Sequence, residues 1–307
     1  MMDIEEKSKE KVEFLASEIK GLQLIITDEI GRLESLKIEN NFNKFKPSSW
    51  CLSATRDALI KLRIFTENNF DYIETMNVIS VSRYILELSI WMKLFERDHD
   101  YGMVYYSQLI STQKKYWNDL LSQARREISL LKSFEEEEGA IRKEKMQEIF
   151  SMPENEALKH AKNWQKDVMD TIDSKAARFF SIYADDAKVN GYGYQAYLVE
   201  TKLIPEIEIS LKSIVAEEAE FNKTVPDSIK NKIPKRWNWR DMAKKVDMDD
   251  EYDYIYSFSS KLIHATPVSV TTNNQSLEIQ EICIFLKYIL VKIQDVIDCS
   301  IKYSPNT

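Results

Sequence analysis

The sequence predicts an all-α protein, a multi-helix bundle with long antiparallel helices. Only 6 glycines and 7 prolines interrupt its 307 residues, whereas loops and hairpins normally require residues with special backbone angles. Apolar residues also recur at spacings of three and four along much of the chain, which is the period of an amphipathic helix. The length allows one large domain or two ordinary ones with a substantial core.

Residues 1–45 are expected to form an N-terminal helix of their own. Apolar residues recur there at alternating three- and four-residue spacings: Val12, Leu15, Ile19, Leu22, Ile26, Leu33 and Leu36. This spacing is close to a coiled-coil seam, and it suits equally well an amphipathic helix packed on its own chain. An intermolecular seam would make the segment an interface for a homodimer or another protein, and the protein a coiled-coil adaptor.

Residues 46–307 are expected to form the bundle. A helix should begin at Pro47 and run to about residue 69, because proline is favoured in the first helical turn. The next helix is expected over about 71–97. The segment DHDYG at 98–102 breaks the pattern, and a long helix to about residue 134 should follow and pack antiparallel to the one before it.

The middle of the chain continues the helical pattern. The charged stretch 135–148 either remains helical or bends at the surface. Another helix is expected over about 152–189, and NGYGY at 190–194 is the clearest turn in the chain. Pro205 should kink or split the helix expected over 194–222, because proline lacks the backbone donor and clashes with the preceding turn.

The C-terminal third begins with an irregular connector, residues 224–239, which contains two prolines. A short helix over 240–246 precedes a helix that carries Tyr252. Residues 265–275, with Pro267 and many Thr and Asn, should end that helix. The last helix is expected over about 276–303.

Composition narrows the class of protein. The formal net charge of −8 favours solubility and argues against a protein that wraps nucleic acid over its whole surface. Cys51, Cys283 and Cys299 are far apart and lack the CxxC spacing of zinc sites and redox motifs. We therefore expect a cytoplasmic protein with no metal and no cofactor.

Neither a secretory signal nor a membrane span is expected. The N-terminus MMDIEEKSKEKVEF is too charged for a signal peptide. The most apolar stretch, residues 282–297, contains Lys287 and Lys292 and is shorter than the roughly 20 residues that a bilayer span requires. We interpret it as a buried central helix and expect no interaction with membranes.

Polar side chains recur at four-residue intervals in two places. The first row lies in YDYIYSFSSKLIH and consists of Tyr252, Tyr256, Ser260 and His264. The second is Arg83 and Glu87, one turn apart in an otherwise apolar helix. Burying such an ion pair is costly unless other polar groups compensate it. We therefore expect Arg83 and Glu87 to point inward and to meet the Tyr252 row in one polar pocket.

The two rows have a structural and a functional interpretation. They could form a buried polar network that only fixes the register of the helices. They could instead form a pocket in which Arg83, Glu87, Tyr252 and Tyr256 bind a ligand. In a catalytic site His264 would be the acid or base, and Ser260 a nucleophile or proton donor. A helical wheel places His264 toward the rim of the pocket, because the row drifts around the helix.

The segment KNKIPKRWNWRDMAKK at 230–245 combines basic and aromatic residues. Such a combination can bind a nucleic-acid backbone and stack bases, and the residues that would do so are Lys235, Arg236, Trp237, Trp239 and Arg240. The alternative is a wrapping loop anchored by its tryptophans, with its lysines solvated. The acidic segment that follows would weaken the basic patch.

Several enzyme classes lack their motifs. No arginine precedes a histidine by four to six residues, as HEPN-type ribonucleases would require. A di-iron bundle needs two Glu-x-x-His motifs, and only Glu96 and His99 match. Glycine-rich phosphate loops, dinucleotide fingerprints and the HExxH zinc motif are absent.

Two segments resemble a known family. SRYILELSIWMKLF at 82–95 and WNWRDMAKKVDMDDEYDYIYSFSSKLIHATP at 237–267 look like the Arg-xxx-Glu helix and the Trp…Tyr-xxx-Tyr-xxx-Ser-xxx-His block of the bacterial domain-of-unknown-function 5677 family. The family-like residues are Arg83, Glu87, Trp239, Tyr252, Tyr256, Ser260 and His264. The resemblance implies a helical bundle with a shared polar cluster, and it implies no established activity.

Three functional hypotheses follow. The first is a cytoplasmic interaction or defence-associated module whose polar pocket binds a small ligand or a partner. The second is a nuclease-like hydrolase that acts on RNA in a toxin or phage-defence system, because some helical families related to the one it resembles act there. The third is the coiled-coil adaptor.

Overall fold

The structure is a computed structural model that describes residues 2–71, 73–153, 156, 168–263 and 276–303. Within these ranges the chain folds into helices joined by short connections and contains no strand. The all-α prediction is therefore confirmed.

The helices group into two compact units. Unit 1 consists of residues 1–107 and 224–307, and unit 2 of residues 108–223. These boundaries differ from the expected division at residue 45, because the N-terminal helices pack into the core of unit 1 instead of standing apart.

Unit 1 is built from both ends of the chain. Its helices are α1 (Met2–Gly21), α2 (Gln23–Glu39), α3 (Pro47–Asn68), α4 (Thr75–Arg97), the first turns of α5 (Tyr101–Phe150), α10 (Asp227–Lys230), α11 (Trp239–Lys245), α12 (Asp249–Ile263) and α14 (Ile279–Lys302). Helix α4 is central, since it contacts α3, α11, α12 and α14. Pro47 begins α3 as predicted, and Glu278 and Glu281 form a capping box at the start of α14.

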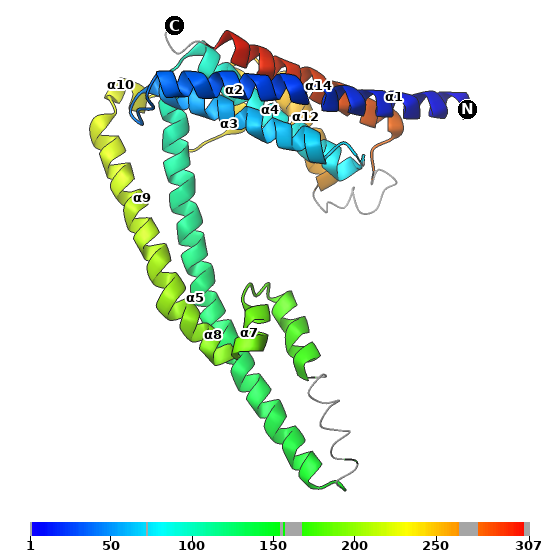
Figure 1. Cartoon of the computed structure of the whole chain (residues 1–307), viewed down its shortest axis with the longest axis vertical. Helices are drawn as coiled ribbons and strands as arrows, with labels where there is room; N and C mark the ends of the chain where they lie inside the picture. Colours follow the sequence, from blue (N-terminus) through cyan, green and yellow to red (C-terminus); the bar gives the residue numbers. More distant parts are fainter. Residues whose placement is uncertain (1, 72, 154–155, 157–167, 264–275, 304–307) are drawn as a thin grey trace. The chain divides into compact units, whose positions relative to one another are not determined.

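The predicted N-terminal seam is buried within the chain. The expected single helix breaks at Leu22, which lies beside Gly21 and separates α1 from α2. Figure 1 shows the two helices following one another along one side of the unit, where α1 packs against α14 and α2 against α3. Ile19, Ile26 and Leu33 are completely buried in this packing. The seam residues therefore act here as the apolar face of amphipathic helices on their own chain.

The sequence predicted a buried central helix over 282–297, and α14 is buried along one face only. One face carries core residues such as Leu286 and Ile293, while Ile284 and Val291 on the opposite face are exposed. Lys292 is almost fully buried among the core residues. In the described part of the chain, no helix is long and apolar enough to cross a bilayer.

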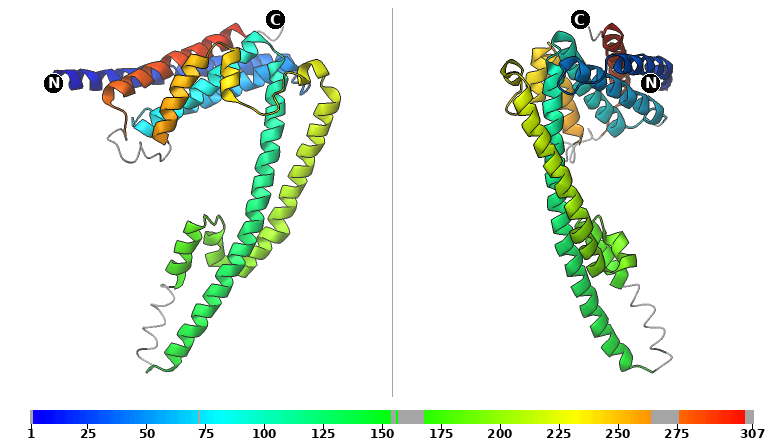
Figure 2. Two further views of the ribbon diagram at one scale, coloured as in Figure 1. Left: turned by 180° about the vertical axis from the view of Figure 1, so that it is seen from behind. Right: turned by 60° about the vertical axis from the view of Figure 1, so that its left-hand side comes forward.

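Unit 2 contains the remainder of α5, helical residues 168–178, α7 (Ala184–Asn190), α8 (Tyr192–Leu198), the π-helical segment η1 (Val199–Leu203) and α9 (Ile204–Thr224). Helix α5 continues through the charged stretch 135–148 without a break. Figures 1 and 2 show α5 and α9 side by side.

Ion pairs give the direction in which α5 and α9 pack. Lys114 pairs with Glu218 at 2.5 Å, and Arg125 lies 3.8 Å from Glu208. A step forward along α5 is thus matched by a step backward along α9, so the two helices are antiparallel. Their shared core includes Leu131 of α5.

Pro205 splits the predicted 194–222 helix, as expected. It is the second residue of α9, and the five residues of η1 before the start of α9 adopt the wider π-helical spacing. A π-turn is a known way to accommodate a residue that cannot continue the regular hydrogen-bond ladder.

The predicted helix over 152–189 is interrupted at residues 179–183, where the chain turns between helical residues 168–178 and α7. The N–H of Ser181 donates to the carbonyl of Ala176, the N–H of Phe180 donates to that of Ala177, and Phe180 has a φ of 52°. This is the Schellman pattern that ends helices, with phenylalanine in the left-handed position that usually holds glycine.

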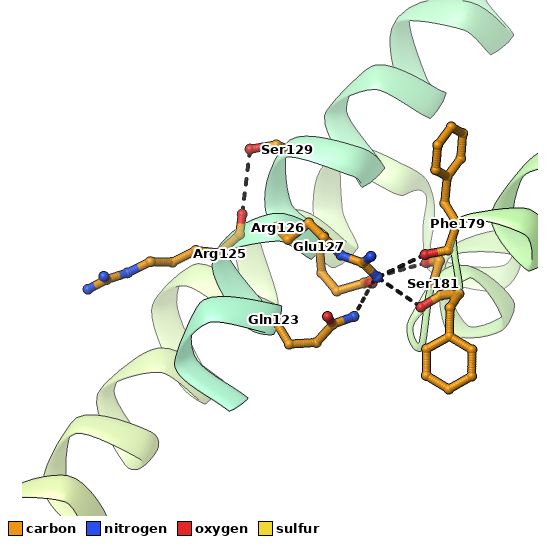
Figure 3. A network of polar contacts seen from close by, with 8 residues as sticks. Gln123, Arg125, Arg126, Glu127, Ser129, Phe179 and Ser181 are labelled. Carbon is orange, nitrogen blue, oxygen red and sulfur yellow. Dashed lines mark hydrogen bonds and ion pairs between the residues drawn. The ribbon is translucent and has the colours of Figure 1, made fainter. Parts of the chain in front are cut away.

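A polar network from α5 holds this turn (Figure 3). The Arg126 guanidinium donates to the carbonyls of Phe179 and Phe180 at 2.8 and 3.1 Å. The Ser181 hydroxyl donates to Glu127 at 2.7 Å, and Glu127 is fully buried. A cation at a helix C-terminus is also attracted to the negative end of the helix dipole. The turn therefore depends on α5 residues about fifty positions away, which local sequence patterns do not reveal.

Candidate functional site

Helices α4 and α12 bring the two predicted polar rows together, and we call this cluster the α4–α12 site. The guanidinium carbon of Arg83 lies 4.2 Å from the centre of the Tyr256 ring, which is a cation–π distance. Arg83 Nε lies 3.5 Å from Glu87 Oε1. The ring of Tyr252 stacks on that of Tyr256, with centroids 5.0 Å apart and planes inclined by 20°. These four predicted residues therefore form one contiguous site.

The site lies at a partly exposed side of α4 and not in the core of unit 1. The side chains of Arg83 and Glu87 remain 27% and 25% exposed, so the expectation of an inward-pointing pair is only partly met. The deeply buried polar residues of α4 are instead Ser82 and Ser89. A pair that is about a quarter exposed retains some contact with water and can also meet a ligand.

Burial sets the electrostatics of the site. Loss of water around the Glu87 carboxyl raises its pKa, and Arg83 offsets part of that effect. Burial also raises the pKa of Tyr252, with a further contribution from Tyr256. Arg83 is thus the positive charge of the site. It lies beside the stacked tyrosine rings and beside a carboxylate whose charged form is disfavoured by burial.

The catalytic end of the predicted row is not joined to this cluster by a described contact. The Ser260 hydroxyl is buried and has no hydrogen-bond partner among the described residues. Its neighbour Ser259 is fully buried and donates to the carbonyl of Tyr256 at 3.1 Å. His264 lies outside the described residues.

A second polar cluster, which the sequence did not predict, fixes α12 from the side of α14. The Tyr288 hydroxyl donates to Glu251 Oε1 at 2.5 Å, and Lys292 Nζ lies 3.1 Å from Glu251 Oε2. The sequence signal for this cluster was Lys292, a charged residue within the apolar run 282–297. Because Glu251 is adjacent to Tyr252, this cluster holds the register in which α12 presents its tyrosines to α4.

The basic aromatic segment folds onto α4. Trp237 stacks on Trp91 with centroids 4.4 Å apart and planes inclined by 16°, and Trp239 lies edge-on to both rings. Arg240 is paired with Asp253 at 2.6 Å. The indoles are therefore engaged within the chain, as in a loop anchored by tryptophans, while Lys235 and Arg236 are exposed.

A cavity of about 160 Å³ lies elsewhere in unit 1, between α3, α4 and α14, and we call it the α4–α14 cavity. It is lined by Thr55, Met92, Phe95, Glu96, His99, Cys299, Lys302 and Tyr303. Burial, followed by the neighbouring Glu96 carboxylate, raises the pKa of the Cys299 thiol to about 11. A protonated thiol is a poor nucleophile, so this arrangement does not support cysteine catalysis.

Sequence patterns did not reveal this cavity, because Cys299 and Lys302 of α14 and the following Tyr303, three of its eight lining residues, come from the far end of the sequence. Glu96 and His99 stood out only as a single Glu-x-x-His match. Within the described part of the chain, no three His, Cys, Asp or Glu side chains are grouped as metal ligands.

Comparison with known proteins gives one result. Residues 62–282 match the sequence model of DUF5677, which is described as a family of unknown function. The match contains α4, α11 and α12 and hence every described residue of the α4–α12 site. No curated protein and no solved structure shows significant similarity to the chain.

Proposed function

The chain belongs to the DUF5677 family of unknown function, and from the geometry of the α4–α12 site we propose that it is a cytoplasmic interaction module that binds an anionic group there. The anion would be a carboxylate or phosphate, carried by a small ligand or by a partner. The observation that carries this proposal is the position of Arg83, a quarter exposed and seated on the ring of Tyr256.

The chemistry of the guanidinium supports an anion. Arginine presents several N–H donors in a planar fork, and a carboxylate or phosphate can accept two of them at once. At 3.5 Å the Glu87 contact is longer than a good charge-assisted hydrogen bond. The tyrosine stack restricts the guanidinium to one plane, so less side-chain entropy is lost on binding.

Titration of the full-length protein with inorganic phosphate and with acetate tests the proposal. The probe is the backbone N–H resonance of Tyr256 in nitrogen-15 NMR, because the ring of Tyr256 lies against the Arg83 guanidinium. This resonance is present in every variant and should shift in a saturable way. Arg83→Gln should abolish the response, and Arg83→Lys should weaken binding about tenfold because it keeps the charge and loses the fork.

Arg63 provides the matched control. It forms an i,i+4 pair with Glu67 on α3 at 3.4 Å, with greater side-chain exposure than the Arg83–Glu87 pair, and no described tyrosine ring lies under its guanidinium. Arg63→Gln should leave the response of Tyr256 to the anion unchanged. If neither anion gives a saturable shift in the millimolar range, or if both variants reduce it equally, the site does not recognise anions.

A second candidate is the nuclease-like hydrolase acting on RNA in a toxin or defence system. The unpartnered buried hydroxyl of Ser260 favours it, since such a group is costly unless a ligand or reaction uses it. RNA cleavage that disappears in both Ser260→Ala and His264→Ala, with folding retained, would support this candidate. Conserved gene neighbours that encode nucleases or ATPases would support the association with defence.

A further inference from the structure

The α4–α14 cavity has the size and wall chemistry of a small-molecule site. Its volume of about 160 Å³ is close to the roughly 150 Å³ of an engineered cavity that admits benzene. Met92 and Phe95, both almost fully buried, form an apolar wall. The cavity can therefore hold a compact apolar group somewhat larger than benzene.

Much of the polar wall is already committed within the chain. The Thr55 hydroxyl donates to the carbonyl of Cys51 at 2.7 Å, and the Tyr303 hydroxyl donates to the carbonyl of Ser48 at 2.8 Å. The ring of Tyr303 lies beside that of His99, with centroids 5.7 Å apart. The hydroxyl protons of Thr55 and Tyr303 are therefore not available to a ligand.

Two exposed charges of opposite sign complete the lining. Glu96 comes from α4 and Lys302 from the last turn of α14. Apart from the Cys299 thiol, which donates to Glu96 at 3.8 Å, no described residue forms a hydrogen bond or an ion pair with either side chain. Both charges act on the pKa of Cys299, which Glu96 raises and Lys302 lowers according to their signs. Both charges therefore lie near that thiol.

A cavity with an apolar wall and with one cation and one anion at its edge suits a molecule that carries an apolar group, one negative charge and one positive charge. From this match we infer that the α4–α14 cavity binds a small zwitterion with an apolar side group, of the class of the aliphatic α-amino acids. The side group occupies the space beside Met92 and Phe95. The ammonium group pairs with Glu96 and the carboxylate pairs with Lys302.

This inference does not depend on the proposed function, because the two sites share no residue. Glu96 and His99 lie in the segment that matches the family, whereas Thr55, Cys299 and Lys302 lie outside it. Binding in this cavity would thus require residues from α3 and α14 outside the matched segment as well as residues inside it.

Calorimetric titration of the full-length protein with L-alanine, L-valine, L-leucine and L-methionine tests the inference. We expect saturable binding that strengthens from alanine to leucine as more apolar surface is buried. Isoamylamine lacks the carboxylate of leucine and isocaproate lacks its ammonium group. Each should bind at least about tenfold more weakly, which is the scale of one lost charge-assisted hydrogen bond.

Substitution of Glu96 and Lys302 tests whether these two charges bind the amino acid. Glu96→Gln and Lys302→Gln should each weaken leucine binding about tenfold. Both side chains are exposed, so both variants should fold. Lys287→Gln is the matched control, because Lys287 is an exposed lysine of the same helix and does not line the cavity.

Methyl NMR gives a readout that depends on position. With carbon-13 methionine methyl labels, leucine should shift the Met92 resonance and leave that of Met242 unchanged. Met242 is a buried residue of the same unit that does not line the cavity. The inference is overturned if none of the four amino acids binds saturably, if isocaproate or isoamylamine binds as tightly as leucine, or if neither glutamine variant changes the affinity.

Discussion

Glu87 shows how one residue of the α4–α12 site responds to its surroundings. Its carboxyl is largely withdrawn from water, and Arg83 stands 3.5 Å away. Burial disfavours the charged carboxylate and the guanidinium favours it, and the net result is a raised pKa. The Arg83–Glu87 pair is therefore not a strong stabilising salt bridge. Its arginine remains available to a ligand because its partner is itself poorly stabilised.

This leads to a prediction about pH. Since the folded carboxyl binds a proton more readily than the unfolded one, Glu87 contributes most to stability below its unfolded pKa. That contribution is lost as the pH rises through the folded pKa. Glu87→Gln has no such dependence, so its stability relative to wild type should increase from pH 4 toward pH 7. Each unit of pKa difference corresponds to about 1.4 kcal/mol.

Urea unfolding of both proteins across this pH range measures the effect. Glu67→Gln on α3 is a suitable control, because Glu67 forms a comparable pair with Arg63 and is 44% exposed. A constant difference in stability between wild type and Glu87→Gln at all pH values would contradict the prediction.

At the scale of elements, the turn at residues 179–183 is specified by its partners on α5 and not by its own sequence. Phe180 adopts a left-handed conformation that glycine would occupy without strain, and its side chain is 75% exposed. Arg126 and Glu127 hold the turn in spite of this strain.

Glycine substitutions at neighbouring positions should therefore have opposite effects. Phe180→Gly should stabilise unit 2 by up to about 1 kcal/mol, because it relieves the left-handed strain and removes little packing. Phe179 does not have a positive φ, so Phe179→Gly should destabilise by roughly 0.5–1 kcal/mol. Thermal unfolding followed by circular dichroism measures both. Destabilisation by Phe180→Gly equal to that by Phe179→Gly would argue against the strained turn.

The sequence could predict features whose partners lie close together along the chain, and with one exception it could not predict those whose partners lie far apart. The start of α3 at Pro47 and the Arg83–Glu87 pair could be predicted because their signals lie within one or two helical turns. The contact between Arg83 and Tyr256 was predictable because a half-buried ion pair requires compensation. Lys292 within an apolar run signalled that a buried charge needs a partner, but spacing within one helix could not identify Glu251 as that partner. The α4–α14 cavity and the turn after residue 178 depend on segments that meet only in the folded chain, and spacing within one helix contains no information about them.

At the scale of the whole molecule, the N-terminal helices complete the core of unit 1. Ile19 of α1 and Ile26 of α2 are completely buried, as are Leu59 of α3 and Leu286 of α14, against which these two helices pack. The apolar seam is consequently occupied within one chain.

Deletion of residues 1–45 separates this arrangement from a coiled-coil adaptor. Removing α1 and α2 should expose apolar surface on α3 and α14, so the truncated protein should aggregate or lose its cooperative unfolding transition. Light scattering and denaturant unfolding would show this. An adaptor would behave differently, since the full-length protein would be a dimer and the truncated protein a stable, well-folded monomer.

The composition of unit 1 from two separate stretches of chain affects the order of events during synthesis. Helix α4 leaves the ribosome early, while α12 and α14, which cover it, are made only after all of unit 2. Throughout that interval α4 is covered only where α3 packs against it, and its faces toward α12 and α14 remain open. Unit 2, being continuous in sequence, can form first, and unit 1 can close only when α14 has emerged. Slow translation or scarce chaperones should therefore harm the folding of unit 1 more than that of unit 2.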